Sequence, residues 1–159
     1  MAWTTSLVLM VRYLINDIDS ATYSDARLKQ SIVIAAQLAS LDVTYDKTYT
    51  INIDAVTITP DPFDETQDSG FINLIALRSA LLIFSNEAKL ASTLGLRVTD
   101  GPSTIDVSGR LSSALRLLDS AKAAYEKAKV DYVIGQARGF QAVTTPYTVP
   151  SISGGDGLE

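Results

Sequence analysis

The sequence contains no cysteine and no histidine among its 159 residues. Without cysteine, a disulfide scaffold, a thiol nucleophile and the cysteine ligands of zinc sites are excluded. Without histidine, no imidazole is present to act as a general base, a general acid or a metal ligand. These two absences remove the side chains on which many small enzymes and metalloproteins depend.

Basic residues are also scarce relative to acidic ones. The 13 Lys and Arg residues are outnumbered by 18 Asp and Glu residues, which gives a formal net charge of -5. A chain with this balance has no general attraction for nucleic acid or for an anionic membrane. The charge is unevenly placed, at -7 from Asp17 to Asp68 and +3 from Ser69 to Arg138. Two differently solvated halves explain this pattern, and so do charge-complementary surfaces for self-association.

No targeting segment is evident near the start of the sequence. The apolar run from Leu7 to Val11 ends at Arg12, far short of a membrane-spanning length. No basic region precedes the run and no cleavage site follows it. We therefore expect a protein made in the cytosol, without a signal peptide and without a membrane partner. What the sequence does contain is 47% hydrophobic residues, which favours one folded domain.

The spacing of apolar residues and helix caps predicts four helices. They are expected from Thr4 or Thr5 to Asn16, from a Ser24 cap to Leu41, from an Asp68 or Ser69 cap to Leu94, and from Asp106 or Ser108 to Gly135. Between the second and third helices, alternating β-branched and aromatic residues predict a β-hairpin near 43–59, ended by prolines. We expect a mainly α (α+β) fold, in which a four-helix bundle-like domain with a small β-hairpin spans 1–137 and an extended C-terminal arm spans 138–159.

The last and longest helix carries a heptad-like seam in which small residues alternate with large ones. The seam consists of Ala114, Leu118, Ala121, Tyr125, Ala128 and Tyr132. Packing within the domain would use such a seam. Packing against another subunit would use it too, because a helix of this length extends beyond a small core.

The C-terminal arm is rich in glycine and proline, which prevent a helix. It is either a flexible tail or an arm that becomes ordered on binding. Several of its residues are apolar and would be wasted in solvent: Phe140, Val143, Tyr147, Val149 and Ile152. We therefore interpret the arm as a segment that docks on a partner.

Catalytic motifs are missing from the sequence. There is no P-loop, no dinucleotide-binding fingerprint and no nucleophile elbow. Acidic residues gather in two expected loops, one with Asp17 and Asp19 and one with Asp61, Asp64, Glu65 and Asp68. The first fits an EF-hand at only two of its ligand positions. Solvated loops are the simpler interpretation and a metal or partner site is the alternative. We expect no cofactor, no bound metal and no enzymatic activity.

One order of segments resembles a known family. The segment YLINDIDSATYSDARLKQSIVIAAQLAS (Tyr13–Ser40) joins an aspartate loop to an alanine-bearing amphipathic helix. It is followed by YTINIDAVTITPDP (Tyr49–Pro62), by LIALRSALLIFSNEAKLAS, and by a long terminal helix and a flexible tail. Over about Leu7 to Gly135, this order resembles the head–tail connector (adaptor) proteins of tailed bacteriophages, which are small helical subunits that form a ring beneath the portal.

The resemblance implies a non-enzymatic virion protein in the phage neck, assembled in the host cytoplasm. Its partners would be the other subunits of a ring of 12 copies, the portal protein, and a neck or tail-completion protein. DNA would pass through the lumen without sequence-specific binding. The arm residues would reach the portal, and either acidic loop could line the lumen or a subunit contact. The alternatives are another phage tail- or head-completion protein, or a small helical ligand-binding domain.

Overall fold

Four α-helices make up most of the structure, a computed structural model that describes residues 3–64, 66–94, 99–100, 103–104 and 108–137. The helices are α1 (Trp3–Ile15), α2 (Asp25–Asp42), α3 (Ser69–Leu94) and α4 (Ser108–Ala137). Strands β1 (Thr50–Asn52) and β2 (Thr57–Thr59) form an antiparallel hairpin, and so do the two-residue strands β3 (Thr99–Asp100) and β4 (Ser103–Thr104). This architecture confirms the predicted mainly α fold with four helices and a small hairpin.

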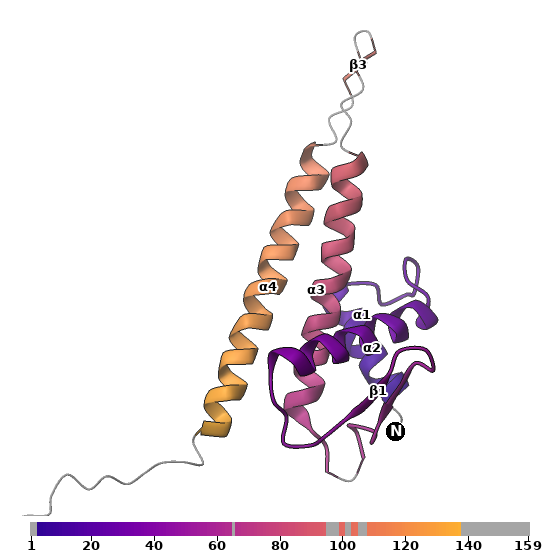
Figure 1. The fold of residues 1–159 in the computed structure, drawn as a ribbon. Helices are drawn as coiled ribbons and strands as arrows, with labels where there is room; N and C mark the ends of the chain where they lie inside the picture. The colour runs from indigo at the N-terminus through magenta and orange to yellow at the C-terminus, as the bar shows by residue number, and fades with distance from the viewer. Residues whose placement is uncertain (1–2, 65, 95–98, 101–102, 105–107, 138–159) are drawn as a thin grey trace, which may run out of the picture.

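Helix α3 is the centre of the arrangement. It lies beside α4 along one side, while α1, α2 and the β1–β2 hairpin gather against its N-terminal half (Figure 1). The segment Ser69–Thr93 is long and apolar enough to cross a membrane by length and composition alone. In the structure this helix contacts the other three helices, and 44% of its apolar window is buried.

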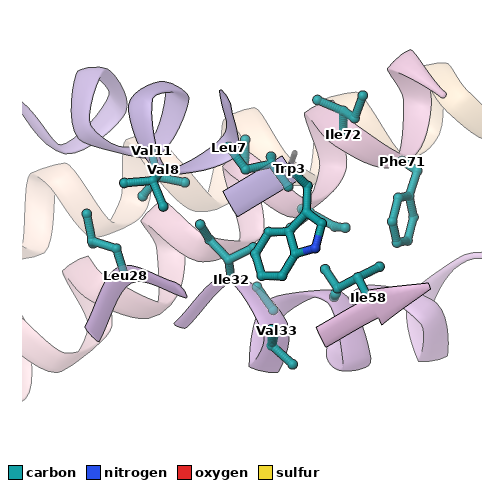
Figure 2. Packing of buried hydrophobic residues seen from close by; sticks show 14 of the residues in the cluster. Trp3, Leu7, Val8, Val11, Leu28, Ile32, Val33, Ile58, Phe71 and Ile72 are labelled. Carbon is teal, nitrogen blue, oxygen red and sulfur yellow. The ribbon is translucent and has the colours of Figure 1, made fainter. Parts of the chain in front are cut away.

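The main core lies between α1, α2, α3 and the β1–β2 hairpin. Figure 2 shows the side chains of α1, among them Trp3 and Leu7, meeting those of α2, such as Ile32, over β2 and the start of α3. A smaller cluster joins the end of α2 to the two long helices through Val43, Leu74 and Tyr125. The short N-terminal helices thus fix one half of α3, and α4 is held to α3 from the opposite side.

Local chemistry explains where the helices begin. The Ser24 hydroxyl accepts a hydrogen bond from the Arg27 N–H at 3.4 Å and caps α2. The Asp68 carboxylate accepts one from the Phe71 N–H at 3.0 Å and caps α3. Helix α1 ends where Asn16 adopts a φ of 58°, a left-handed conformation that asparagine tolerates.

The β1–β2 hairpin is shorter than the range 43–59 that the alternating pattern indicated. The strands pair only from Thr50 to Thr59, and Asp54 and Ala55 lie in the turn between them. Val43 and Tyr45 do not join a strand. They follow α2 toward α3 and α4, where Val43 is buried and the Tyr45 ring packs edge-on against Phe71. Packing against helices can produce the same alternation as pairing in a sheet.

Candidate functional site

The first acidic loop is organised around a buried arginine. Arg12, near the end of α1, donates from Nη1 to the backbone oxygen and the carboxylate of Asp17, both at 3.0 Å. Its Nη2 donates to the Tyr23 carbonyl at 2.9 Å and to the Asp25 carboxylate at 2.5 Å. The guanidinium thus satisfies four acceptors that the loop brings together.

Asp17 is a structural residue of this loop. Its two carboxylate oxygens accept the backbone N–H groups of Thr22 and Tyr23, each at 3.0 Å. The bond from Thr22, helped by that from Tyr23 and by the charge of Arg12, lowers the pKa of Asp17 against the opposing effect of burial. The side chain is buried, so its charge serves the loop. Asp19, by contrast, is exposed.

The second acidic loop is also used partly for folding. Asp61 accepts the Trp3 N–H at 3.0 Å and so satisfies a backbone donor in the first turn of α1, where the helix dipole favours a negative charge. Asp68, besides capping α3, accepts the Tyr49 hydroxyl at 2.9 Å. Asp64 is exposed, and Glu65 lies outside the described residues. Of the acidic side chains predicted to line a lumen, Asp19 and Asp64 are therefore the two that the described structure leaves exposed.

The α4 seam faces α3 in its C-terminal half. Tyr125 is fully buried, and its hydroxyl donates to the Asp42 carboxylate at 2.8 Å. The guanidinium carbon of Arg78 lies 4.9 Å from the centre of the same ring. Burial, together with the bond to Asp42, raises the pKa of Tyr125. This single ring therefore ties α4 to α3 and to the end of α2.

Tyr132, two turns further along α4, makes a second contact between α4 and α3. Its ring packs directly on Gly70 at the start of α3 and lies 5.6 Å from the Tyr45 ring, centre to centre. Gln136 donates to its hydroxyl at 2.9 Å and also to the Thr44 carbonyl at 3.3 Å. The other seam residues are half-buried: Ala114, Leu118, Ala121 and Ala128. Within the chain, therefore, the seam packs most tightly at Tyr125 and Tyr132.

An open apolar groove of about 570 Å³ lies between α1, α3 and α4. Its α1 wall includes two strongly exposed side chains, Leu9 at 53% and Tyr13 at 63%. The lining consists of Leu9, Met10, Tyr13, Leu14, Asn73, Ala76, Leu77 and Ala128. Only Asn73 and the tyrosine hydroxyl introduce polar groups, so the groove suits an apolar partner.

The apolar spacing along α1 did not indicate this groove. That spacing predicts Leu14 on the same buried stripe as Leu7 and Val11, but the side chain is 42% exposed and lines the groove. The buried face consists instead of Trp3, Leu7, Val8 and Val11. The available signal was that α1 is apolar on nearly every side, which is more than one buried face requires.

A second exposed apolar set lies on α4. Val130, Val133 and Ile134 are each about half exposed and follow helical spacing, and we call them the outer stripe. The seam residues Tyr125 and Ala128 lie on a different face of the helix. Around the helix axis, Val130 lies about 160° from Ala128. Helix α4 thus presents one apolar face to α3 and a second one to solvent.

The arm residues Phe140, Val143, Tyr147, Val149 and Ile152 lie outside the described residues. Among the residues that the structure describes, no group of three or more Asp and Glu side chains is placed to hold a metal ion. The chain matches no protein-family model, no curated protein and no solved structure. Its site is therefore interpreted from its own residues, and the groove is the most distinctive surface among those described.

Proposed function

We propose that this chain is a non-enzymatic structural protein of a tailed-phage virion, a head–tail connector (adaptor) subunit. In this proposal it forms a ring, of 12 copies as in the family that the sequence resembles. The ring joins the portal to the neck or tail, and DNA passes through its lumen. The observation that supports the proposal is the open apolar groove, because exposed apolar side chains in such a groove suit contact with another polypeptide.

Two different apolar surfaces support assembly into a ring. The groove lies between α1, α3 and α4, whereas the outer stripe lies on a separate face of α4. A closed ring of more than two identical subunits requires each contact to join two different faces. The groove and the stripe are two such faces, and each can contact a different face of a neighbouring subunit. Exposed Asp19 and Asp64 would add to an acidic surface that repels passing DNA.

Localisation is the direct test of this proposal. The purified protein should be present in virions at the neck, detected by mass spectrometry and by labelling in electron micrographs. Mixing it with the portal protein encoded in the same genome should yield a large complex in light scattering. A chain that stays monomeric with the portal and is missing from particles would refute the connector role. A chain found elsewhere in the particle would instead be another head- or tail-completion protein.

A matched pair of variants tests whether the groove is part of the ring contact. Leu9→Arg places a charge on the groove wall, and burying that charge in a subunit contact is costly. We expect this variant to fold and to lose assembly. Leu41→Arg makes the same change at an exposed leucine outside the groove and should assemble normally. Equal assembly by both variants would remove the groove from the ring contact.

Arm deletion tests the portal contact separately. Removing Gln141–Glu159 should leave the helical domain folded, since the two core clusters are built from residues before Ala137. The shortened chain should bind the portal more weakly. Loss of helical circular dichroism on deletion would show that the arm belongs to the folded domain.

The groove volume also favours a second candidate, a small apolar ligand. About 570 Å³ lies within the range of roughly 300–1,000 Å³ that is common for small-molecule sites. A bound ligand would raise the melting temperature by an amount that grows with the logarithm of its concentration above Kd. A broad thermal-shift screen with apolar compounds tests this candidate, and no shift in any condition would eliminate it.

A further inference from the structure

The groove is apolar, open and without a described partner inside the chain. None of its eight described lining side chains carries a charge. Leu9 and Tyr13 leave more than half of their surface in water, which is unfavourable for a free subunit. A segment that covers the groove must therefore be apolar, and it must not bring charged groups into contact with the lining.

We infer that in the unassembled protein this groove is covered by the chain's own C-terminal segment, residues 139–155. The inference goes beyond the proposed function and does not depend on it, because it concerns the isolated chain. The groove would then serve as an internal docking site that keeps the apolar lining from other copies until a partner captures the arm.

The absence of charged residues favours this segment over the outer stripe of a second copy as the occupant of the groove. The 17 residues from Gly139 to Gly155 contain no Asp, Glu, Lys or Arg, and no longer uncharged stretch occurs in the sequence. The outer stripe of a second copy is different, since Lys127, Lys129 and Asp131 are interspersed with its residues. Seating that stripe in the groove would place charges close to an apolar lining. The C-terminal segment brings none.

The short distance from the end of α4 to the groove also favours the chain's own segment. Helix α4 ends at Ala137, and Ala128 in the groove wall lies nine residues earlier. Nine helical residues span about 13–14 Å. Four or five extended residues cover that distance at about 3.3 Å each. The segment from Val143 onward, with most of its apolar residues, is therefore long enough to lie along the groove.

The sequence of the segment suits a groove with helical walls. Backbone groups in helix interiors are already paired, so these walls offer an occupant little main-chain hydrogen bonding. Each N–H that an occupant buries unpaired is costly. Pro146 and Pro150 have no N–H, and they flank the apolar residues Tyr147 and Val149. Attachment to the same chain adds an effective concentration in the millimolar range, which favours this occupant over a second copy.

The absence of cysteine makes a direct test possible, because introduced thiols are the only ones in the chain. Asn73→Cys lies in the groove lining and is exposed, and it is combined with Tyr147→Cys in the arm. The control combines Ala123→Cys with Tyr147→Cys. Ala123 is exposed on α4, about 140° around the helix from Ala128. Both full-length double variants are oxidised at low protein concentration, and unfolding curves by circular dichroism verify that they are folded.

We expect the groove pair to form a disulfide within one chain about tenfold faster than the control pair, because the arm is held at the groove. Adding Leu9→Arg to the groove pair should reduce its rate toward that of the control, whereas adding Leu41→Arg should not. Equal rates for the two pairs would overturn the inference. A disulfide that joins two chains, at a rate that rises with protein concentration, would also overturn it and would make a second copy the occupant.

The outcome is separable from that of the proposed function. The disulfide measurement uses only the isolated chain, whereas the connector role is judged from particles and the portal. A chain with a covered groove that is missing from virions would retain this inference and lose the connector role. A connector whose arm never approaches the groove would retain the connector role and overturn this inference.

Discussion

Gly70 is the position where a single added methyl group tests how α3 and α4 fit together. A Cβ atom at this residue would overlap the Tyr132 ring, with Cδ2 of that ring at 2.6 Å. Ordinary carbon–carbon contacts lie at about 3.5–4.0 Å, so something must shift. The ring has limited room, because it lies against Tyr45 and its hydroxyl is bonded to Gln136. We therefore expect Gly70→Ala to force α4 away from the start of α3.

Two opposing effects, overpacking and helix propensity, determine how much the free energy of unfolding changes. Overpacking at a tight contact costs about 1–3 kcal/mol. Alanine favours a helix over glycine by about 1 kcal/mol in the interior, and Gly70 is in the first turn of α3, where that gain is smaller. The net expectation for Gly70→Ala is a loss of about 1–2 kcal/mol in the free energy of unfolding. For a chain of this size that loss lowers Tm by roughly 2–8 °C.

Urea unfolding followed by circular dichroism measures the effect, with two controls. Gly135→Ala adds the same methyl group to α4, where nothing lies within 4 Å, so it should leave stability unchanged or raise it by about 0.5 kcal/mol. In a Tyr132→Ala background the obstacle is gone, and Gly70→Ala should become neutral or stabilising. Equal losses in both backgrounds, or no loss in the native background, would refute the assignment of the contact.

Three further predictions concern the polar groups. Arg12→Met should destabilise the domain by about 2 kcal/mol or more in urea unfolding, because the Tyr23 carbonyl and the buried Asp17 carboxylate each lose a charged donor. A loss well below that would contradict the role assigned to Arg12. The pKa of Asp17 is lowered by folding, so its contribution is present above its unfolded value of 3.8 and lost as pH falls below it. Asp17→Asn should therefore flatten the decline of stability in acid, and an unchanged slope would exclude Asp17 as its source. Burial raises the pKa of five tyrosines: Tyr23, Tyr45, Tyr49, Tyr125 and Tyr132. Their tyrosinate absorbance above pH 10 should therefore rise together with loss of helical dichroism, and ionisation of these five in a folded protein would contradict the burial of their rings.

Helix positions were predictable because their signals are local. Ser24 and Asp68 are cap residues whose partners lie three residues away, so the sequence alone locates both helix starts. The same holds for the length of α3, whose apolar residues leave almost no polar face. Local signals do not show which apolar residues find partners. Leu7 and Leu9 are two residues apart on α1, yet the first is fully buried and the second is exposed in the groove.

The roles of the acidic residues depended on contacts between distant segments. Asp17 looked like a solvated loop residue, and nothing near it in the sequence indicated that Arg12 turns back to bind it. Asp61 bonds to Trp3 across 58 residues, and Tyr125 bonds to Asp42 across 83. Such pairs are set by the tertiary fold. The sequence therefore identified the acidic loops but could not separate their structural members from the exposed ones, Asp19 and Asp64.

The contact between Gly70 and Tyr132 also affects the groove, so Gly70→Ala should have a functional consequence. Tyr132 and Ala128 lie one turn apart on α4, and Ala128 forms part of the groove wall. A shift of α4 that relieves the clash at Gly70 must therefore move that wall relative to α1 and α3. We expect Gly70→Ala to slow the disulfide between the groove and the arm, and Gly135→Ala to leave its rate unchanged. A Gly70→Ala protein that loses stability yet keeps the native disulfide rate would show that the groove wall is independent of the packing of Tyr132.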